Sequence, residues 1–581
     1  MRLQEITIEK SEYSEMYFRG GVIVENAIHL KKGESVSFDT YFNSLDYPKY
    51  LEYTKVKTVT VSLDIEGEGE LCLCTFDGKE ERVVRRATSS GAVAELSATL
   101  DGLAENGILY PVFFAHTDTV IKGGGYFCEN EADTVSCAIV ICTFHREECV
   151  YKNLKLLSEE RIKGIDRIYV IDNGQTLDKS GIDTDYIKIL PNKNYGGSGG
   201  FTRGIIEAYE AEDISLTHVI LMDDDVVIYK NALEKIIAFL SLRKEEAKNA
   251  HISASMLPLS CIAKQFEAGA KWNGSCIESF KQGLDLRQRE SLIKNLEKDD
   301  VQYGAWWCFC IPLNTVRRWG LPLPMFIKFD DVEYGTRCCQ DSPIITLNGV
   351  CVAHEDFDRK YSMHLEYYNI RNQLIMLACH NRQNRFGCIS RLAKVSARHL
   401  FLYRYEEMDV VLRAFEDFLK GADFLMSQDW EELNREIMSQ APKSKNLSEI
   451  NGWRNEMREG YSHKKRSLVS KAVQVLTLGG HIIPSCFLKR EIGAFPLPDA
   501  KVGSSYLRKK TIQYQLGSDT GYEFNRHTGK FLKYFFKSIS MAVKILFLYP
   551  RAKRSYNDSF MKLTSFDFWK EKLGKTHCVL Q

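Results

Sequence analysis

The feature of this sequence that most constrains its fold is a change of hydrophobic period near residue 135. In residues 58–65 apolar and polar side chains alternate, which is typical of a strand with one buried face. Similar short segments at 22–28, 35–41, 70–76 and 109–115 follow one another without a helical pattern between them. We therefore predict an N-terminal antiparallel β-sandwich of the jelly-roll kind over residues 1–134.

Beyond residue 135 the apolar runs become continuous and alternate with helical segments. Strands buried on both faces are expected at 136–142, 167–171, 186–190 and 218–222, and helices at 147–160 and from 201 to about 211. This order predicts a central, mostly parallel α/β domain over residues 135–380. Residues 381–581 carry helical spacing, as in the apolar set 410, 411, 414, 415, 418 and 419, and predict a mostly helical C-terminal region.

Composition restricts the functional class and the compartment. Lys plus Arg and Asp plus Glu both number 77, and this balance argues against a dedicated nucleic-acid binder. The 17 cysteines contain no CxxC pair, the first residues have no apolar signal core, and no long uncharged apolar run appears. We therefore expect reduced thiols, a cytoplasmic location and no nucleic-acid partner.

Three adjacent acids, Asp223, Asp224 and Asp225, directly follow the strand expected at 218–222. Ligands of open α/β sheets bind beyond the carboxyl ends of the strands, where these residues fall. Adjacent carboxylates repel one another unless a cation neutralises them, and hard oxygen ligands suit Mg²⁺ or Mn²⁺. The alternative is a solvated acidic turn or helix start.

Four other features each allow a functional and a structural interpretation. The glycine-rich segment 194–200 either presents backbone N–H groups to a phosphate or makes a tight turn before a helix at Phe201. The pair Trp306–Trp307 is either core or a platform for a sugar ring. The pair Asp330–Asp331 is either catalytic or a helix cap, and His354 after a short strand is either structural or a metal ligand.

Together and in this order, these segments resemble the inverting, metal-dependent glycosyltransferases of family 2, which have the GT-A nucleotide-sugar transferase fold. Within that family the chain is most similar to the bacterial galactofuranosyltransferases that polymerise cell-wall galactan. Those enzymes also carry an N-terminal β-sandwich and C-terminal helices. The matching stretches are CTFHRE (142–147), VIDNG (170–174), NYGGSGGFTRG (194–204), MDDD (222–225), AWW (305–307), IKFDDVEYGTR (327–337), AH (353–354) and YNIRN (368–372).

The resemblance implies a role for each matching position. It assigns uridine diphosphate and sugar binding to Arg146, Asp172, Asn173, Asn194, Asp223 and Asp224, and Mn²⁺ or Mg²⁺ binding to Asp223, Asp225 and His354. It assigns the catalytic base to Asp331 and acceptor binding to Trp306, Trp307, Asp330 and Asn369. Two positions depart from the family pattern: Phe329 stands where the galactan polymerases have Trp, and Asn369 where they have His.

The function implied by this resemblance is transfer of galactofuranose from UDP-galactofuranose, with inversion, to a hydroxyl of a growing, lipid-linked cell-surface glycan. Inversion requires one base for the acceptor hydroxyl and a cation near the departing diphosphate, and the sequence offers both. The alternatives are a rhamnosyl- or galactopyranosyltransferase of capsule or O-antigen synthesis, a nucleotidyltransferase on a similar sheet, and a non-enzymatic glycan-binding protein.

A basic amphipathic segment at 532–556 adds an expectation about location. Its apolar residues fall on one helical stripe, and Lys533, Lys537 and Lys544 fall on the opposite stripe; the apolar residues are Leu532, Phe535, Phe536, Ile539, Val543, Leu546 and Phe547. Such a helix lies in a membrane interface, which predicts peripheral contact with the inner face of the cell membrane. The alternative is that the stripe packs on the protein. The sequence leaves the oligomeric state open, a homo-oligomer included.

Overall fold

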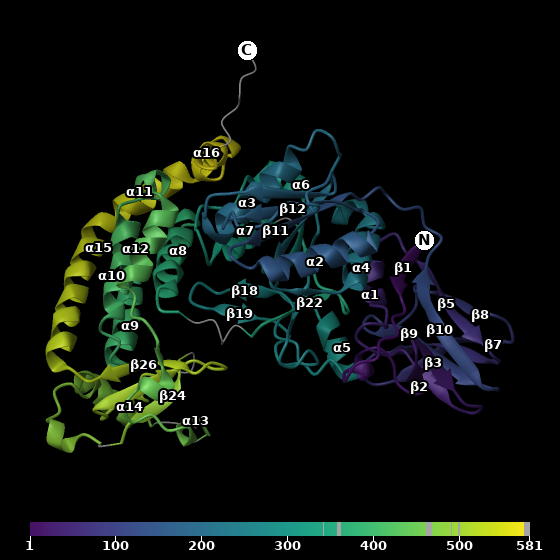
Figure 1. The fold of residues 1–581 in the computed structure, drawn as a ribbon, viewed down its shortest axis with the longest axis horizontal. Coiled ribbons are helices and arrows are strands. Elements are labelled where there is room, and N and C mark those ends of the chain that lie inside the picture. The colour runs from purple at the N-terminus through teal and green to yellow at the C-terminus, as the bar shows by residue number, and fades with distance from the viewer. Residues whose placement is uncertain (341, 357–361, 460–466, 490, 498–499, 575–581) are drawn as a thin grey trace, which may run out of the picture. The chain divides into compact units, whose positions relative to one another are not determined.

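The structure is a computed structural model of the 581-residue chain that describes residues 1–340, 342–356, 362–459, 467–489, 491–497 and 500–574 (Figure 1). Its contacts divide the chain into two compact units. Unit 1 comprises Met1–Leu323, Asp331–Glu355 and Trp569–Gln581, and unit 2 comprises Pro324–Asp330 and Asp356–Phe568. The chain therefore passes through unit 2 in the short segment Pro324–Asp330 and returns to unit 1 at Asp331. It leaves unit 1 again after Glu355.

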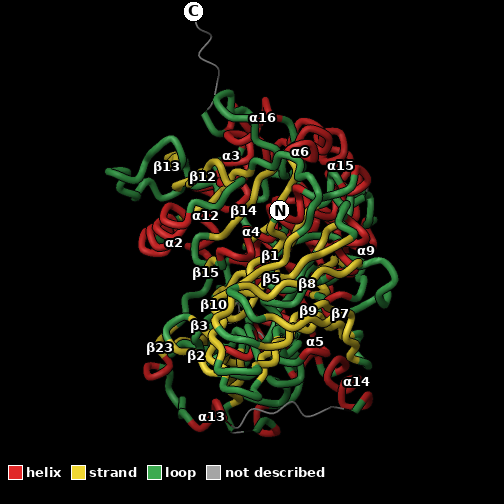
Figure 2. Tube along the Cα trace, turned by 90° about the vertical axis from the view of Figure 1, so that its right-hand side faces the viewer, coloured by secondary structure: helices red, strands yellow, loops and turns green. Residues whose placement is uncertain are grey.

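The N-terminal part of unit 1 consists of two antiparallel sheets, as predicted; Figure 2 shows several of their strands side by side. One sheet has the order β2-β3-β10-β5-β8, with β1 added beside β10: β1 (Arg2–Glu5), β2 (Val22–Val24), β3 (Ala27–Leu30), β5 (Thr58–Glu66), β8 (Val93–Thr99) and β10 (Thr119–Phe127). The other has the order β4-β9-β6-β7: β4 (Ser35–Ser37), β6 (Gly69–Phe76), β7 (Glu81–Ser89) and β9 (Ile108–Ala115). A short helix, α1 (Tyr47–Tyr53), joins β4 to β5.

The alternation that predicted these strands is the pattern of their burial. Val59, Val61, Leu63 and Ile65 of β5 are all buried, and the residues between them are less so. The strand expected at 22–28 is instead the hairpin β2–β3, because Glu25 adopts a positive φ of 55° and the chain reverses there.

The centre of unit 1 is a seven-stranded sheet of order β13-β12-β11-β14-β20-β16-β21. Its strands are β11 (Cys137–Thr143), β12 (Ile165–Asp172), β13 (Ile187–Pro191), β14 (His218–Asp223), β16 (His251–Ser253), β20 (Cys308–Pro312) and β21 (Ile344–Ile345). The four strands from β13 to β14 run parallel, and β20 runs antiparallel to β14. The continuous apolar runs are buried on both faces, since every residue from Cys137 to Ile141 is buried.

Six helices and two smaller sheets complete this part of unit 1 among the described residues. The helices are α2 (Glu147–Glu160), α3 (Gly196–Tyr209), α4 (Lys230–Ser241), α5 (Arg289–Leu296), α6 (Leu313–Trp319) and α7 (Asp330–Cys338), the last of which begins one residue before unit 1 resumes. A three-stranded sheet has the order β15 (Val227–Ile228), β22 (Cys351–His354), β17 (Ser255–Pro258), and a hairpin joins β18 (Ala270–Trp272) to β19 (Ile277–Ser279).

Unit 2 is mostly helical, as predicted for the C-terminal region. Its helices are α8 (Leu365–Cys379), α9 (Arg385–Phe401), α10 (Glu407–Leu419), α11 (Ala422–Ser427), α12 (Trp430–Gln440), α13 (Glu456–Glu459), α14 (Leu468–Leu476) and α15 (Thr528–Leu563), and α16 (Phe566–Lys572) follows at its border with unit 1. The long helix α15 packs against α8, α9 and α10. None of the described helices combines the length with the apolar character that a bilayer crossing requires.

A four-stranded sheet in unit 2 has no counterpart in the sequence prediction. Its order is β23 (Lys445–Asn446), β26 (Thr520–Asn525), β25 (Lys510–Tyr514), β24 (Gly493–Pro496). A small core of Leu447, Ile450, Ile512 and Tyr514 lies on it. Its strands are two to six residues long, which is too short for a clear period of two to stand out.

Candidate active site at the carboxyl end of the central sheet

The structure brings the three predicted metal ligands together through two strands. Asp223 ends β14, and Asp224 and Asp225 make the turn that follows it. The chain then forms β15, where Val227 pairs with Ala353 of β22. Because His354 is the next residue of β22, this pairing brings it beside Asp225 although it is far away in the sequence.

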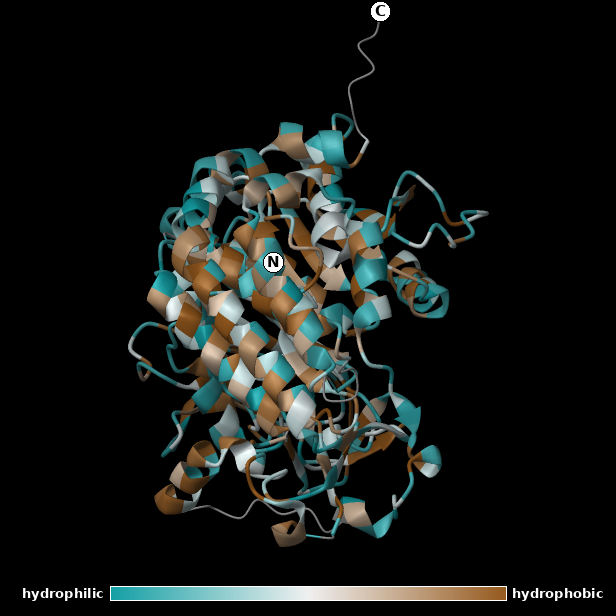
Figure 3. Cartoon of the chain, turned by 90° about the vertical axis from the view of Figure 1, so that its left-hand side faces the viewer, coloured by the Kyte–Doolittle hydropathy of each residue, from teal (hydrophilic) through white to brown (hydrophobic). Residues whose placement is uncertain are grey.

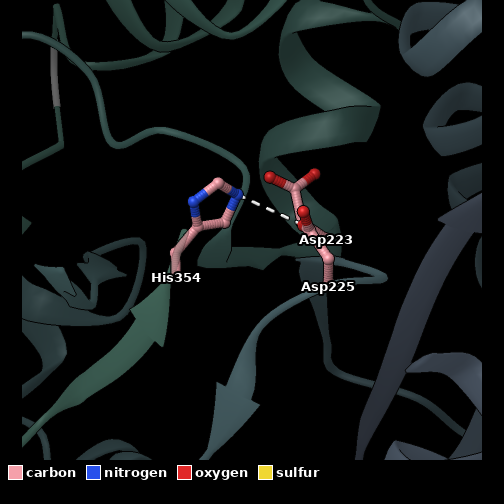
Figure 4. A group of neighbouring side chains, drawn as sticks. All are labelled: Asp223, Asp225 and His354. Carbon is pink, nitrogen blue, oxygen red and sulfur yellow. Dashed lines mark ion pairs between the residues drawn. The ribbon is translucent and has the colours of Figure 1, made fainter. Parts of the chain in front are cut away.

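One ligand atom from each of Asp223, Asp225 and His354 lies within 4.8 Å of the others (Figure 4). The His354 Nε2 atom is 3.2 Å from Asp225 Oδ1. The His354 Nδ1 atom is 2.5 Å from the backbone carbonyl oxygen of Glu355, to which it donates when it carries the proton. That hydrogen bond leaves Nε2 directed at the carboxylates, which is the arrangement of a metal-binding histidine. Two carboxylates and an imidazole fit Mn²⁺ or Mg²⁺.

The carboxylates also perturb their own titration and that of the histidine. Burial works to lower the pKa of His354, but its hydrogen bond to Asp225 and the charges of Asp225 and Asp223 outweigh burial and raise it. Asp224 is buried, and this burial, together with its two acidic neighbours, raises its pKa to about 6. The acidic turn is therefore a partly buried, strongly interacting group and not a solvated surface turn.

Arg146, the residue that precedes α2, and Asn153 within α2 stabilise this turn. Arg146 forms an ion pair with Asp225, and its Nη1 atom is also 3.6 Å from Asp224 Oδ1. Asn153 donates its side-chain amide to the carbonyl oxygens of Asp224 at 3.2 Å and Val226 at 3.1 Å. Arg146, predicted to bind the donor, thus lies at the start of α2 directly beside the predicted metal ligands.

The other predicted donor-binding residues lie along the same edge of the sheet. Asp172 of β12 pairs with Thr143 of β11. The preceding residue of β11, Cys142, pairs with Asp223 of β14 on the other side. The Asp172 carboxylate accepts hydrogen bonds from the backbone N–H groups of Gly174, at 3.0 Å, and Leu177, at 2.9 Å. It therefore folds the loop after β12.

Asn173 and Asn194 connect that loop to α3. The Asn173 amide donates to the carbonyl oxygen of Gly196 at 3.0 Å, and its oxygen accepts from Asn192 at 2.8 Å. The Asn194 oxygen accepts from the backbone N–H of Gly196 at 3.1 Å. The contacts described for Asp172, Asn173 and Asn194 shape the edge of the sheet, and their predicted role toward the donor remains a prediction.

The glycine-rich segment is not a loop before a helix at Phe201, because α3 begins at Gly196. A side chain at Gly200 would come within 2.1 Å of the Cys142 sulfur, and one at Gly204 within 2.2 Å of Val140. Gly200 and Gly204 therefore let α3 approach β11 closely.

The two tryptophans lie beside the acidic turn but are buried. The Asp223 backbone N–H is 3.4 Å from the Trp307 carbonyl oxygen, across the β14–β20 pair. Trp307 donates its indole N–H to Ala254 at 3.0 Å, and only 6% of it is exposed. Trp306 is 5% exposed, packs against Phe201 and Tyr334, and has no hydrogen-bond partner for its indole N–H among the described residues. The pair is thus buried in this structure and forms no open platform.

Asp331, the predicted base, is the second residue of α7. It is half-buried, and its carboxylate accepts a hydrogen bond from the backbone N–H of Val332 at 2.8 Å. The helix packs closely on the segment that leads to the tryptophans, because a side chain at Gly335 would meet Tyr303. Another acid of this helix, Glu333, is fully buried in an ion pair with Arg337 at 2.9 Å and is not available as a base.

A buried acid that sequence reasoning missed, Glu267, lies near Asp331. It is 3% exposed, and its Oε2 accepts a hydrogen bond from Ser279 at 2.5 Å, whereas its Oε1 has no partner within the described residues. Burial, with a contribution from the Asp331 charge, raises its pKa to about 7. Its backbone pairs with Met256 of β17, the strand beside β22. In the sequence, this acid could have been noticed only because it stands alone in a segment of small and apolar residues.

Asp330, Asn369 and Phe329 belong to unit 2. Asp330 and Phe329 are buried in the chain before Asp331, and Asn369 is half-buried on α8. Their predicted roles in acceptor binding, like that of the tryptophans, remain predictions.

Two family models match the sequence in adjacent stretches. The model described as galactofuranosyltransferase 2 N-terminal matches residues 10–129, which include every strand of the two antiparallel sheets except β1. The model of glycosyl transferase family 2 matches residues 138–245, which include β11 to β14 and the acidic turn. These matches confirm both the resemblance to family 2 and the predicted fold class, with its GT-A-like central domain.

Two curated relatives are similar over most of the chain. The galactofuranosyltransferase GlfT2 of Mycobacterium tuberculosis is 25% identical over 428 residues, which are 68% of this chain and 66% of that protein. GlfT2 of Mycolicibacterium smegmatis is 25% identical over 424 residues, 68% of this chain and 65% of that protein. The matched region thus spans slightly less than two thirds of each relative.

Similarity to solved structures is weak. A mannosyltransferase from Pyrobaculum calidifontis, in complex with GDP-Man and Mn²⁺, has a TM-score of 0.29 and 10% identity, over 54% of this chain and 87% of that one. Glucosyl-3-phosphoglycerate synthase from Mycobacterium tuberculosis, with Mn²⁺ and uridine diphosphate, has a TM-score of 0.25 and 12% identity, over 42% and 79%. Scores this low support no conclusion about function.

Proposed function

Because the chain belongs to glycosyl transferase family 2 and is a distant homologue of galactofuranosyltransferase GlfT2, we propose that it transfers galactofuranose from UDP-galactofuranose to a hydroxyl of a growing glycan, with inversion. The observation that carries this proposal is the convergence of Asp223, Asp225 and His354 at the carboxyl end of β14. That is the edge at which open α/β sheets bind their ligands.

The donor side of the reaction lies around the acidic turn. Asp223, Asp225 and His354 are the residues that would hold Mn²⁺ or Mg²⁺, and a cation there supplies charge stabilisation to a departing diphosphate. In this proposal Arg146 binds a phosphate oxygen of the donor by charge-assisted hydrogen bonds, and its position beside two carboxylates of the turn supports that role.

The acceptor side requires a base, and Asp331 fills that role in this proposal. The acceptor hydroxyl loses its proton to the Asp331 carboxylate while its oxygen forms a bond to the anomeric carbon of the donor. The bond between that carbon and the diphosphate oxygen breaks at the same time, so the configuration inverts. Glu267, buried near Asp331 with one oxygen that has no partner among the described residues, is placed to hydrogen-bond a sugar hydroxyl.

The acceptor and the location follow from the same proposal. A cell-surface glycan that grows inside the cell is attached to a lipid, so the substrate is a glycolipid at the cytoplasmic face of the membrane. The enzyme then contacts that membrane peripherally. Trp306, whose indole N–H has no hydrogen-bond partner among the described residues, keeps its proposed acceptor role. So do Trp307, Asp330 and Asn369.

A panel of donors tests this function. The full chain is incubated with Mn²⁺, a water-soluble galactofuranoside acceptor and each of several UDP- and dTDP-sugars, and nucleotide release and product formation are measured. We expect acceptor-dependent UDP release with UDP-galactofuranose that EDTA abolishes. Equal release with and without acceptor, or transfer that EDTA does not affect, would contradict the proposal.

A second candidate is another family 2 transfer, of rhamnose or galactopyranose, in capsule or O-antigen synthesis. Two departures from the galactan polymerases, Phe329 and Asn369, favour it, because they replace side chains expected near the sugar subsites. The same panel separates the two: preferred turnover of a dTDP-rhamnose or UDP-galactopyranose donor identifies the second.

A further inference from the structure

The long helix α15 has two apolar faces, and only one of them is covered by protein. The buried face packs against α8, α9 and α10; its members are Phe531, Tyr534, Met541, Ile545, Tyr549, Ala552 and Tyr556. The other face is exposed; its members, here called the α15 face, are Leu532, Phe536, Ile539, Val543 and Phe547. Phe536 is 62% exposed and Phe547 is 73% exposed. In Figure 3, where the side of the chain that carries α15 faces the viewer, apolar segments recur along this helix.

A row of ion pairs accompanies the buried packing of α15, and turning the α15 face inward would break these pairs. Lys530 pairs with Glu406 at 2.5 Å, Lys537 with Asp409 at 2.9 Å, and Lys544 with Glu416 at 2.9 Å. The acids of this row belong to α10 or directly precede it. Tyr534 adds a hydrogen bond to Asp409 at 2.6 Å. Single exposed pairs contribute little, so they add to the preference for this rotation that the buried face of α15 provides.

A second exposed apolar surface lies on α14, which is linked to the first turn of α15. In α14, Leu468, Val469, Val475 and Leu476 are between 61% and 82% exposed. The turn after α14 is fixed to the start of α15, because the His481 ring stacks on Phe531 at 4.1 Å and its carbonyl oxygen accepts from Arg526 at 2.7 Å. The exposure of α14 is thus held by defined contacts.

Cations without a carboxylate partner accompany the α15 face. The helix has eight Lys or Arg residues and one acid, Asp558. Of its cations, Lys533, Arg551 and Arg554 are exposed and form no ion pair with a carboxylate within the described residues. Lys533 and Arg551 are eighteen positions, or five helical turns, apart, and therefore lie on the same side of the helix.

We propose that the α15 face docks unit 2 onto an anionic lipid surface, with Phe536 and Phe547 in the interface and Lys533, Arg551 and Arg554 at the headgroups. An apolar face beside unpaired cations is the pattern of a helix that lies in a membrane interface. This inference deepens the proposed function, because a glycolipid acceptor would be held at the same surface.

The charge pattern disfavours a second copy of the chain as the occupant. In a two-fold dimer through this face, each helix would meet its own copy, and Lys533, Arg551 and Arg554 would face one another without acids between them. Juxtaposed like charges oppose such an interface. Anionic headgroups instead neutralise the same cations.

Vesicle flotation of the full-length protein tests the proposal. The probes are phosphatidylcholine vesicles with and without an anionic phospholipid, at low and high salt. One variant is Phe536→Ser with Phe547→Ser, and another combines Lys533→Glu, Arg551→Glu and Arg554→Glu. Lys537 and Lys544 are left unchanged, because their substitution would break the ion pairs with α10. The matched controls are Phe114→Ser, an exposed aromatic of β9, and Lys31→Glu with Lys32→Glu.

We expect the wild type to float with anionic vesicles at low salt, and each α15 variant to bind at least about tenfold less, given the apolar area and the basic residues that are lost. The controls should bind as the wild type does. Circular dichroism and UDP release with the water-soluble acceptor should be unchanged in all variants, which separates failure of docking from failure of the proposed function. Absence of flotation of the wild type, or equal flotation of the variants, would overturn the proposal. The proposal would also be overturned if the double variant Phe536→Ser with Phe547→Ser still floated with vesicles while light scattering showed that it had changed from an oligomer to a monomer.

Discussion

The side-chain amide of Asn372 donates a hydrogen bond to the carbonyl oxygen of Lys328 at 2.8 Å. The same amide also reaches the carbonyl oxygens of Met325 at 3.0 Å and Ile327 at 2.8 Å. Phe326, Lys328 and Phe329 all have positive φ, between 67° and 72°. Such residues cost about 1–3 kcal/mol each and persist only where surrounding contacts enforce them. Asn372 thus secures the strained backbone that immediately precedes Asp331.

We predict that Asn372→Asp lowers kcat by up to about 10²-fold, because a misplaced base is costly and a carboxylate cannot donate to the three carbonyls. KM for the donor should change little, and the pH profile of kcat should be altered. The control is Asn451→Asp, an exposed asparagine of the same unit. A parallel loss of kcat and thermal stability with an unaltered pH profile would assign Asn372 a purely structural role.

Asp331→Asn should lower kcat by the ~10²–10⁴-fold that a general base supplies. Donor binding should be retained, since Asp331 is not one of the grouped ligands Asp223, Asp225 and His354. Single-turnover kinetics and UDP titration measure the two effects separately. Asp101→Asn, at an exposed aspartate of the N-terminal part of unit 1, serves as the control. Near-normal turnover by Asp331→Asn would exclude it as the base.

Glu267→Gln should change how stability depends on pH. The folded protein holds the Glu267 proton up to a pKa of about 7, whereas the unfolded chain releases it near the ordinary value of 4.5. The free energy of unfolding therefore falls as the pH rises from about 4.5 to about 7, by up to roughly 3 kcal/mol for this group, and is level above that.

The glutamine variant lacks this penalty, so its melting temperature should exceed that of the wild type at pH values above the Glu267 pKa and approach it in acid. Glu290→Gln, on the exposed side of α5, is the control. Thermal unfolding monitored across the pH range measures the difference. A constant offset between Glu267→Gln and wild type at every pH would show that folding does not shift the pKa of this carboxyl.

Gly200→Ala should destabilise unit 1 by about 1–3 kcal/mol, as overpacking of a tight contact does. The added methyl group would lie 2.1 Å from the Cys142 sulfur and force α3 away from β11. The control is Gly91→Ala, where no atom lies within 4 Å of the new side chain. Chemical denaturation gives both values. Equal stability of the two variants would mean that α3 does not pack as closely as described.

The parts of this structure that were predictable from sequence are those with local signals. The alternation in β5 and the continuous apolar run of β14 identified their sheets, and a strand end followed by Asp223 and Asp225 indicated a cation site. The proximity of His354 was not derivable from the residues alone, because it depends on the pairing of β15 with β22; only the family resemblance pointed to it.

Other features depended on tertiary contacts that no local pattern records. The glycines before Phe201 favoured a loop, but they lie within α3, and Gly200 lets that helix approach β11. The burial of Trp306 and the position of Glu267 follow from long-range packing. In α15 both Phe531 and Phe536 are apolar, and only the packing against α9 and α10 decides that Phe531 is the buried one.

The central claim is that Asp223, Asp225 and His354 bind a divalent cation on which donor binding depends. The most direct test is calorimetric titration of UDP into the full-length protein, with Mn²⁺ and with EDTA, for the wild type and for Asp225→Ala and His354→Ala. We predict binding to the wild type that requires Mn²⁺ and is weakened in each variant, because each variant removes one of three protein ligands. UDP binding of equal affinity in EDTA, or Mn²⁺-dependent binding that neither substitution weakens, would contradict the account.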